Sequence, residues 1–342
     1  MSRFQDDFPA RSGAAPAVSG LGRSDHGKAR HGNDVPVAQD RVFDGLADKF
    51  ADGLYATGRG QIRLAVLDEV LSRELPANGL PALDVGGGLG QMSAWLARRG
   101  HAVTLAEPSA DMLTRAETTV AGQNVALLRA PLQALPAQAP GPWSIIVCHA
   151  VLEWLADPRA ALGTLKALLA QGGRLSLMVF NRDALRFSNV VKGNLDKALE
   201  DRLAGTGRRQ RLTPISPLTH ADIESWCHEE GLVIESVTGV RIFHDYLRER
   251  APDEAALAKV IALEKRYCQV EPHWRLGRYL HYLIRPEADG LVCPDADGSI
   301  RPEADGLIRP EAGGSNLPAA DEPSLPSAGS SPDADELQGA SR

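Results

Sequence analysis

A glycine-rich turn between a buried strand and a helix is the feature that most constrains this 342-residue chain. It reads Leu83-Asp84-Val85-Gly86-Gly87-Gly88-Leu89-Gly90-Gln91. Glycines let the backbone turn sharply and approach a ligand closely, and the helix that follows offers free N–H groups at its N-terminus. A dinucleotide-binding loop would need a third glycine where Gln91 stands. The turn therefore predicts a ligand site at the end of a first strand, but not a dinucleotide site.

Hydrophobic patterns of strand and helix alternate around this turn. A helix is expected over 58–74, where Ile62, Val66, Leu67, Val70 and Leu71 share one face. Further strands are expected over 82–85, 101–106, 125–128, 143–148 and 173–180, with helices over 90–99, 109–120 and 158–169. Alternation in units of this length predicts an α/β fold with a doubly wound, mostly parallel sheet.

The rest of the chain divides around that sheet. Segments 233–241 and 279–284 are expected to form two closing strands, with 182–230 inserted as a helical segment. We expect one domain over 41–285, preceded by a disordered arm over 1–40 that lacks apolar periodicity. Residues 286–342 repeat the string Arg-Pro-Glu-Ala and carry few large apolar side chains, which predicts a solvated acidic tail.

The formal net charge of −7 argues at first against a nucleic-acid partner. The tail over 286–342, however, holds three basic and twelve acidic side chains, whereas 41–285 hold 29 basic and 27 acidic ones. The predicted domain is therefore slightly basic. Within it, residues 182–211 carry eight basic and four acidic side chains, an excess suited to phosphate contacts.

The cysteines and the hydropathy pattern indicate in which cellular compartment the protein is expected. The four cysteines have no C-x-x-C pair and no histidine at metal-ligand spacing, so we expect reduced thiols and no metal site. The N-terminus lacks a signal-peptide pattern, and the longest apolar stretch, 143–155, is too short for a membrane span. We expect a cytoplasmic protein.

Four further residues lie where three strands should end beside the glycine turn. Glu107 follows the second strand, 21 residues after Gly86, which is the spacing of an acidic residue that binds ribose hydroxyls in this architecture. Leu132 and Gln133 follow the third strand. His149 ends the fourth strand, where its position favours contact with a cofactor or substrate over a purely structural role.

Asp84-x-Gly-x-Gly-x-Gly resembles the turn of class I methyltransferases that bind S-adenosylmethionine. Longer strings resemble one family within that superfamily, the bacterial tRNA 5-carboxymethoxyuridine methyltransferases, over about residues 42–285. They are Phe43-Asp44 with Lys49-Phe50, Tyr55-x-Thr57 with Gly60-Gln61-x-Arg63, His149-Ala-Val-Leu-Glu-Trp-Leu-Ala-Asp-Pro158, Gly193-Asn-Leu-Asp196, Gly239-Val-Arg-Ile-Phe-His-Asp-Tyr-Leu-Arg248 and Leu276-Gly-Arg-Tyr-x-His281. The resemblance implies a Rossmann-like methyltransferase fold.

The resemblance also implies a reaction, namely methyl esterification of the carboxylate of 5-carboxymethoxyuridine at the wobble position of tRNA. A carboxylate is ionised at neutral pH, so no general base and no catalytic side chain is expected. S-adenosylmethionine is the expected cofactor. The residues expected to bind it are Arg63, Gly86, Gly87, Glu107, Leu132, Gln133 and His149.

For the substrate carboxylate a second cation is needed, and we expect Arg241, with Tyr246 and Tyr55 as wall residues. A structural Arg241 paired with Asp245 is an equal alternative. In the basic segment 182–211 we expect Arg208, Arg209 and Arg211 to contact tRNA. The competing interpretation is that these residues form a solvated helix surface. The expected partner is the anticodon loop of tRNA, with no DNA, no membrane and a monomeric state favoured.

Two other functions stay open on the sequence alone. The first is a methyltransferase that acts on a small carboxylic acid or quinone precursor. The second is a non-catalytic cofactor-binding protein that associates with tRNA.

Overall fold

The computed structural model describes residues 39–51, 57–76, 79–205, 214–248 and 252–287. The strands are β1 (Pro81–Val85), β2 (Ala102–Ala106), β3 (Val125–Leu128), β4 (Trp143–His149), β5 (Leu169–Phe180), β6 (Leu232–Val240) and β7 (Tyr279–Pro286). The α-helices are α1 (Ala47–Phe50), α2 (Gly58–Glu74), α3 (Gln91–Arg98), α4 (Ala110–Thr119), α5 (Leu135–Gln138), α6 (Pro158–Leu168), α7 (Arg182–Val191), α8 (Leu195–Leu199), α9 (His220–Glu229) and α10 (Glu254–Tyr267). Short 3₁₀ turns are η2 (Leu132–Ala134), η3 (Leu152–Trp154), η4 (His244–Tyr246) and η5 (His273–Leu276).

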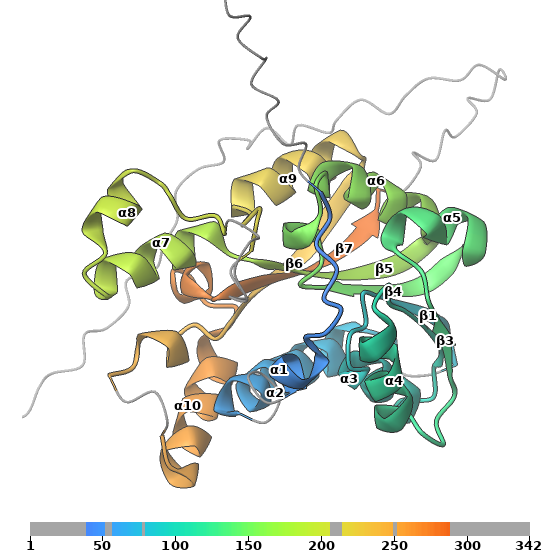
Figure 1. Cartoon of the computed structure of the whole chain (residues 1–342), viewed down its shortest axis with the longest axis horizontal. Coiled ribbons are helices and arrows are strands. Elements are labelled where there is room, and N and C mark those ends of the chain that lie inside the picture. Colours follow the sequence, from blue (N-terminus) through green and yellow to red (C-terminus); the bar gives the residue numbers. More distant parts are fainter. Residues whose placement is uncertain (1–38, 52–56, 77–78, 206–213, 249–251, 288–342) are drawn as a thin grey trace, which may run out of the picture. The chain divides into compact units, whose positions relative to one another are not determined.

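The strands form one sheet in the order β3-β2-β1-β4-β5-β7-β6 (Figure 1). The first five strands run parallel, and β7 runs antiparallel between β5 and β6. The prediction of a doubly wound, mostly parallel sheet is confirmed. The sequence located both closing strands but did not predict that the last strand pairs between β5 and β6.

Helices cover both faces of this sheet, which therefore separates two apolar cores. On one face α2 buries the side chains that its periodicity predicted, including Ile62, Leu67 and Leu71 at 1% exposure or less, against β1, β4 and α10. On the other face α6 and α9 pack Leu162, Leu165 and Ile223 against β5 and β7. Burial of each such side chain stabilises the fold by about 1.5–3 kcal/mol. Because both faces of the sheet are buried in this way, packing on both sides holds the sheet in place.

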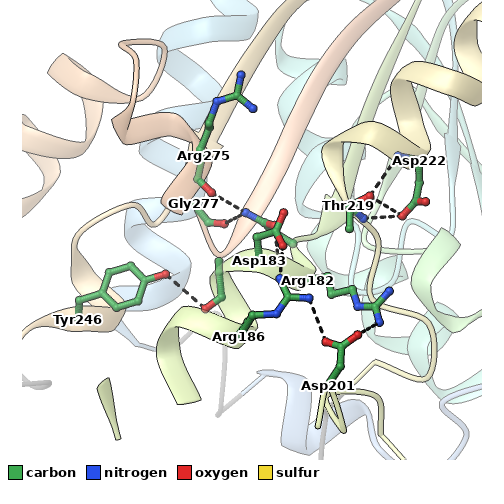
Figure 2. A network of polar contacts seen from close by, with 11 residues as sticks. Arg182, Asp183, Arg186, Asp201, Thr219, Asp222, Tyr246, Arg275 and Gly277 are labelled. Carbon is green, nitrogen blue, oxygen red and sulfur yellow. Dashed lines mark hydrogen bonds and ion pairs between the residues drawn. The ribbon is translucent and has the colours of Figure 1, made fainter. Parts of the chain in front are cut away.

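The segment expected as an insertion, 182–230, falls into two parts. Helix α7 follows β5 directly and α8 buries no side chain, and these two helices contact each other beside the sheet (Figure 1). Arg182 and Arg186 of α7 both pair with Asp201, and Figure 2 shows this network. Helix α9, by contrast, packs on β6 and α6 and contributes Ile223 and Cys227 to the core.

Three cysteines of the described residues are buried and form no disulfide, namely Cys148, Cys227 and Cys268. Cys293 lies outside the described residues. In the described ranges, none of the helices is long and apolar enough to cross a membrane.

A capping box fixes the start of α9 (Figure 2). The Thr219 hydroxyl accepts a hydrogen bond from the Asp222 N–H at 3.1 Å, and the Asp222 carboxylate accepts one from the Thr219 N–H at 2.8 Å. Such reciprocal bonds satisfy helix N–H groups that otherwise lack a partner.

Thr219→Ala is expected to lower the free energy of unfolding by about 1 kcal/mol, because the first turn of α9 loses its acceptor. Urea unfolding followed by circular dichroism measures this. Thr219→Ser keeps the hydroxyl and is the matched control. Equal losses in both variants would show that the capping hydrogen bond does not stabilise α9.

Candidate functional site

A cavity of about 290 Å³ opens at the carboxyl ends of the parallel strands. Its wall is formed by the glycine turn after β1, Glu107 after β2, residues 130–133 after β3 and residues 149–151 and 153–155 after β4. Phe180 of β5, Arg241 after β6, and Arg278 and Tyr279 at β7 complete the far side. This is the crevice in which doubly wound sheets bind ligands, beside the point where strand order reverses between β1 and β4.

The glycine turn is packed so closely against its neighbours that it has no room for side chains. Gly86 has a φ of +64°, and a Cβ there would lie 2.5 Å from a Val151 methyl carbon. A Cβ on Gly87 would lie 2.6 Å from Leu105. The N–H groups of Gly86 and Gly87 both donate to the carbonyl of Ala106, so the turn is bonded to β2. Glycine is required here by contact and by conformation alike.

The Asp84 side chain, on the strand before the turn, bonds to the helix that follows the turn. Its carboxyl accepts a hydrogen bond of 2.6 Å from the Ser93 hydroxyl in α3 and is 2% exposed. Burial raises its pKa to about 6, and the hydrogen bond from Ser93 and the charge of Arg63 act in the opposite direction. Asp84 thus ties β1 to α3.

Glu107 lies at the rim of the turn. Its two oxygens accept hydrogen bonds from the Gly88 N–H at 3.1 Å and the Ser109 N–H at 3.0 Å. Burial raises the pKa of Glu107, and the nearby carboxylates of Asp84 and Asp44 add to this. A carboxylate has about four acceptor sites, so Glu107 retains capacity for the two hydroxyls of a ribose.

Residues after β3 meet a segment from the N-terminal side of the domain. Leu132 is buried in the cavity wall, whereas Gln133 is exposed and donates a hydrogen bond of 2.7 Å to Asp40. Asp40 also accepts from the Ala156 N–H at 2.7 Å. The segment 39–51, blue in Figure 1, therefore crosses from the end of β4 to the glycine turn. Asp40, expected in a disordered arm, is bonded at both carboxylate oxygens.

His149 is buried at the end of β4 and lines the cavity. Its Nε2 lies 2.8 Å from the Ser176 hydroxyl, which lies 2.8 Å from Nε2 of His281. Its Nδ1 has no hydrogen-bond partner among the described residues. Burial holds the pKa of His149 well below its ordinary value, assisted by the charges of His281 and Arg63. The ring is therefore neutral, and the hydrogen-bonding capacity of Nδ1 is unused among the described residues.

Arg63 extends from α2 into the cavity and is 5% exposed. Its guanidinium lies over the Tyr279 ring at 5.4 Å and makes no hydrogen bond or ion pair with the described residues. A buried guanidinium without an anion is costly, so this position suits a negatively charged ligand group.

Arg241 lines the cavity with a φ of +62° and is paired with Asp245. Its Nη2 donates at 2.6 and 2.7 Å and its Nε at 3.1 Å. The paired form that the sequence left open is the one present. Burial would raise the pKa of Asp245, but hydrogen bonds from His244 and Arg241 hold it far below its usual range.

The other expected substrate residues lie elsewhere. Tyr246 is not among the described residues that line the cavity, since its hydroxyl donates to the Leu276 carbonyl at 2.9 Å and its ring packs against Phe187. The structure therefore places Tyr246 outside the lining of this cavity, and its contact with the substrate stays a prediction. Tyr55 and the three arginines of the basic segment lie outside the described residues, namely Arg208, Arg209 and Arg211.

Glu153 is a cavity residue that sequence reasoning missed, although it stands in the string that begins at His149. It is 1% exposed, and neither carboxyl oxygen has a hydrogen-bond partner among the described residues. Burial raises its pKa to about 8, against the smaller influence of nearby backbone N–H groups and Arg63. Glu153 is therefore protonated at neutral pH.

Comparison with known proteins agrees with this site. A family model described as a methyltransferase domain matches residues 59–237. The chain is also 41% identical over 256 residues to the tRNA 5-carboxymethoxyuridine methyltransferase of Escherichia coli K12, which covers 72% of this chain and 97% of that protein. This chain belongs to the tRNA 5-carboxymethoxyuridine methyltransferase family.

Two further matches are more distant. A ubiquinone biosynthesis O-methyltransferase of Xylella fastidiosa (strain M23) is 31% identical over 220 residues, covering 60% of this chain and 87% of that protein. A complex of the Haloferax volcanii Trm112 methyltransferase activator with a methyltransferase gives a TM-score of 0.50 at 16% identity, covering 72% of this chain and 100% of that chain. The latter shows the fold alone.

The cofactor of the tRNA 5-carboxymethoxyuridine methyltransferase family is S-adenosylmethionine, and the described residues fit its chemistry. Arg63 offers an unpaired guanidinium for a carboxylate. Glu107 offers free acceptor sites for ribose hydroxyls, and Leu132 an apolar surface for a base. Charged, polar and apolar parts of the ligand thus each have a counterpart in the wall.

Gly86→Ala is expected to weaken S-adenosylhomocysteine binding about tenfold or more, because the added methyl group meets Val151 inside the cavity. Isothermal titration calorimetry measures the change. Gly122→Ala is the matched control, since Gly122 has a similar φ of +73° but no atom within 4 Å of the new Cβ. Equal affinities for Gly86→Ala and wild type would contradict a cofactor contact at this turn.

Glu153→Gln is expected to gain stability relative to wild type as pH rises. In wild type the unfolded chain loses this proton near pH 4.5 and the folded chain only near pH 8. The unfolded state therefore binds fewer protons between these values, and wild-type stability falls there by up to ~1.4 kcal/mol per pH unit. Urea unfolding at pH 5, 6.5 and 8 tests this. A stability difference that does not change with pH would show that Glu153 ionises normally.

Proposed function

We propose that this chain transfers a methyl group from S-adenosylmethionine to the carboxylate of 5-carboxymethoxyuridine in tRNA, forming 5-methoxycarbonylmethoxyuridine. The relative of that name, aligned over 97% of its length, carries this proposal. The ligand-facing arginines of the cavity support it, because they provide cations for two separate carboxylates, one on the cofactor and one on the substrate.

The cofactor is held, in this proposal, by the residues already located around the glycine turn. Arg63 binds its carboxylate, Glu107 its ribose hydroxyls, and Leu132 and Gln133 lie beside its base. Gly86 and Gly87 give it access to the backbone, and His149 presents Nδ1 toward it. When bound, S-adenosylmethionine supplies a methyl group on a positively charged sulfur, which becomes a neutral thioether as the substrate oxygen takes that group.

No side chain needs to remove a proton in this reaction, because the substrate carboxylate is already ionised at neutral pH. The titratable groups of the cavity agree with that. His149 is neutral but held by Ser176, and Glu153 is protonated, so neither is poised as a general base. The protein contributes alignment of the two reactants and exclusion of water.

The basic segment is proposed to contact the phosphates of the anticodon loop through Arg208, Arg209 and Arg211. Other basic side chains of this segment are already ion-paired, namely Arg182 and Arg186 with Asp201, and Arg202 with Glu200. Such pairs leave little net charge on α7 and the residues after α8. We further propose that the protein acts in the cytoplasm.

Incubating the protein and S-adenosylmethionine with tRNA that carries 5-carboxymethoxyuridine is expected to give the methyl ester, detected by mass spectrometry of nucleosides. The same tRNA with unmodified uridine at that position is the control. Methylation of small carboxylic acids or quinone precursors alone would favour a metabolite enzyme. Cofactor binding without transfer to any of these substrates would favour a non-catalytic protein.

A further inference from the structure

Three guanidinium groups share the wall of the cavity that faces β7. Those of Arg63 and Arg241 lie 5.4 and 5.8 Å from the centre of the Tyr279 ring. That of Arg278 lies over the Phe180 ring at 4.3 Å. The two aromatic rings pack edge to face with their centres 5.5 Å apart, so all three cations lie against one aromatic pair.

The carboxylate of Asp245 lies beside two of these cations and contacts them unequally. Asp245 accepts three hydrogen bonds from Arg241, whereas its Oδ2 is 3.6 Å from Nε of Arg278, beyond hydrogen-bond distance. One carboxylate therefore faces two guanidinium groups, and one positive charge is left over. Arg63 is a third cation of this wall and adds to the positive charge, but it lies on α2, beside the glycine turn that we assign to the cofactor.

Two guanidinium groups of this wall, those of Arg63 and Arg278, make no hydrogen bond with the described residues, and Arg63 is the one that we assign to the cofactor. Arg278 forms one ion pair, with Asp245, and its N–H donors stay available. Among the described residues its side chain makes no hydrogen bond, and it is 20% exposed. Burial lowers its pKa and the charge of Arg241 adds to this, while Asp245 and the phenols of Tyr279 and Tyr246 act in the opposite direction. An anion entering the cavity would satisfy both the unused donors and the excess charge.

The geometry of the fork suits a carboxylate in particular. A guanidinium presents parallel N–H groups that match two carboxylate oxygens. The Phe180 ring covers one face of the Arg278 fork and Asp245 lies on its Nε side, so the plane is held before a ligand arrives. The Arg241 fork, by contrast, is already occupied at Nε and Nη2.

We propose that Arg278, and not Arg241, binds the substrate carboxylate directly, with Asp245 and Phe180 positioning its guanidinium. Arg241 then acts on Asp245 and has no direct contact with the substrate carboxylate. This inference rests on the proposed function. It replaces the expectation that Arg241 is the carboxylate-binding residue and keeps the need for a second cation.

Arg278→Gln and Arg278→Lys in the full chain test the proposal. The probes are two anticodon stem-loops, one with 5-carboxymethoxyuridine and one with 5-methoxyuridine, titrated into each protein in the presence of S-adenosylhomocysteine. Wild type is expected to prefer the carboxylate. Arg278→Gln should lose about 10- to 100-fold of that preference, as expected for a lost charged hydrogen-bond pair. Arg278→Lys should keep part of it, because its charge remains.

Two further readouts separate binding from folding. Affinity for S-adenosylhomocysteine and for the 5-methoxyuridine stem-loop should stay unchanged in both variants. The KM for tRNA bearing the carboxylate should rise in Arg278→Gln. Arg174→Gln is the matched control, since Arg174 pairs with Glu235 and lies outside the lining of this cavity.

An unchanged carboxylate preference in Arg278→Gln would overturn the inference, while ester formation by wild type would still support the proposed function. A variant that weakens both stem-loops equally would also contradict it, because the effect would not depend on the carboxylate. Wild type without carboxylate preference and without ester formation would instead overturn the proposed function itself.

Discussion

The close approach of the glycine turn to its neighbours is the constraint on which the site depends. Gly86 lies where any side chain would strike Val151, and its N–H is bonded to the Ala106 carbonyl of β2. Val151 in turn follows β4, so the ends of β1, β2 and β4 are held at fixed spacing by one short segment. Asp84, Glu107 and His149 take their positions from those strand ends. The cavity is therefore a product of backbone packing, and its polar groups are placed by it.

Much of the fold could be predicted from the sequence because its signals are local. The helix over 58–74 and the strand over 125–128 match the structure to the residue, since periodicity and cap residues act within a few positions. The place of β7 between β5 and β6 could not be predicted. Antiparallel pairing with two neighbours depends on contacts between segments far apart in sequence, which periodicity does not report.

The same distinction divides the candidate site. The place of Glu107 in the cavity wall could be predicted, because its offset from the glycine turn is fixed by one strand and one helix, while its contact with a ribose stays a prediction. The hydrogen bond from the Tyr246 hydroxyl to Leu276 could not be predicted, because it joins residues 30 positions apart and no local pattern indicates it. Glu153 and Arg278 were missed for a related reason. Their significance lies in hydrogen bonds that they do not make with the described residues, and an unused donor or acceptor can be recognised only once the surroundings are known.

The excess positive charge at Arg278 has a consequence for the release of product. Esterification turns an anion into a neutral group, so on our proposal the chemical step removes the feature by which the substrate is recognised. The ester offers the guanidinium a much weaker acceptor than the carboxylate did. Product would then leave more readily than substrate, and finished tRNA would compete poorly for the enzyme. A charge left unbalanced in the free protein thus favours turnover over retention.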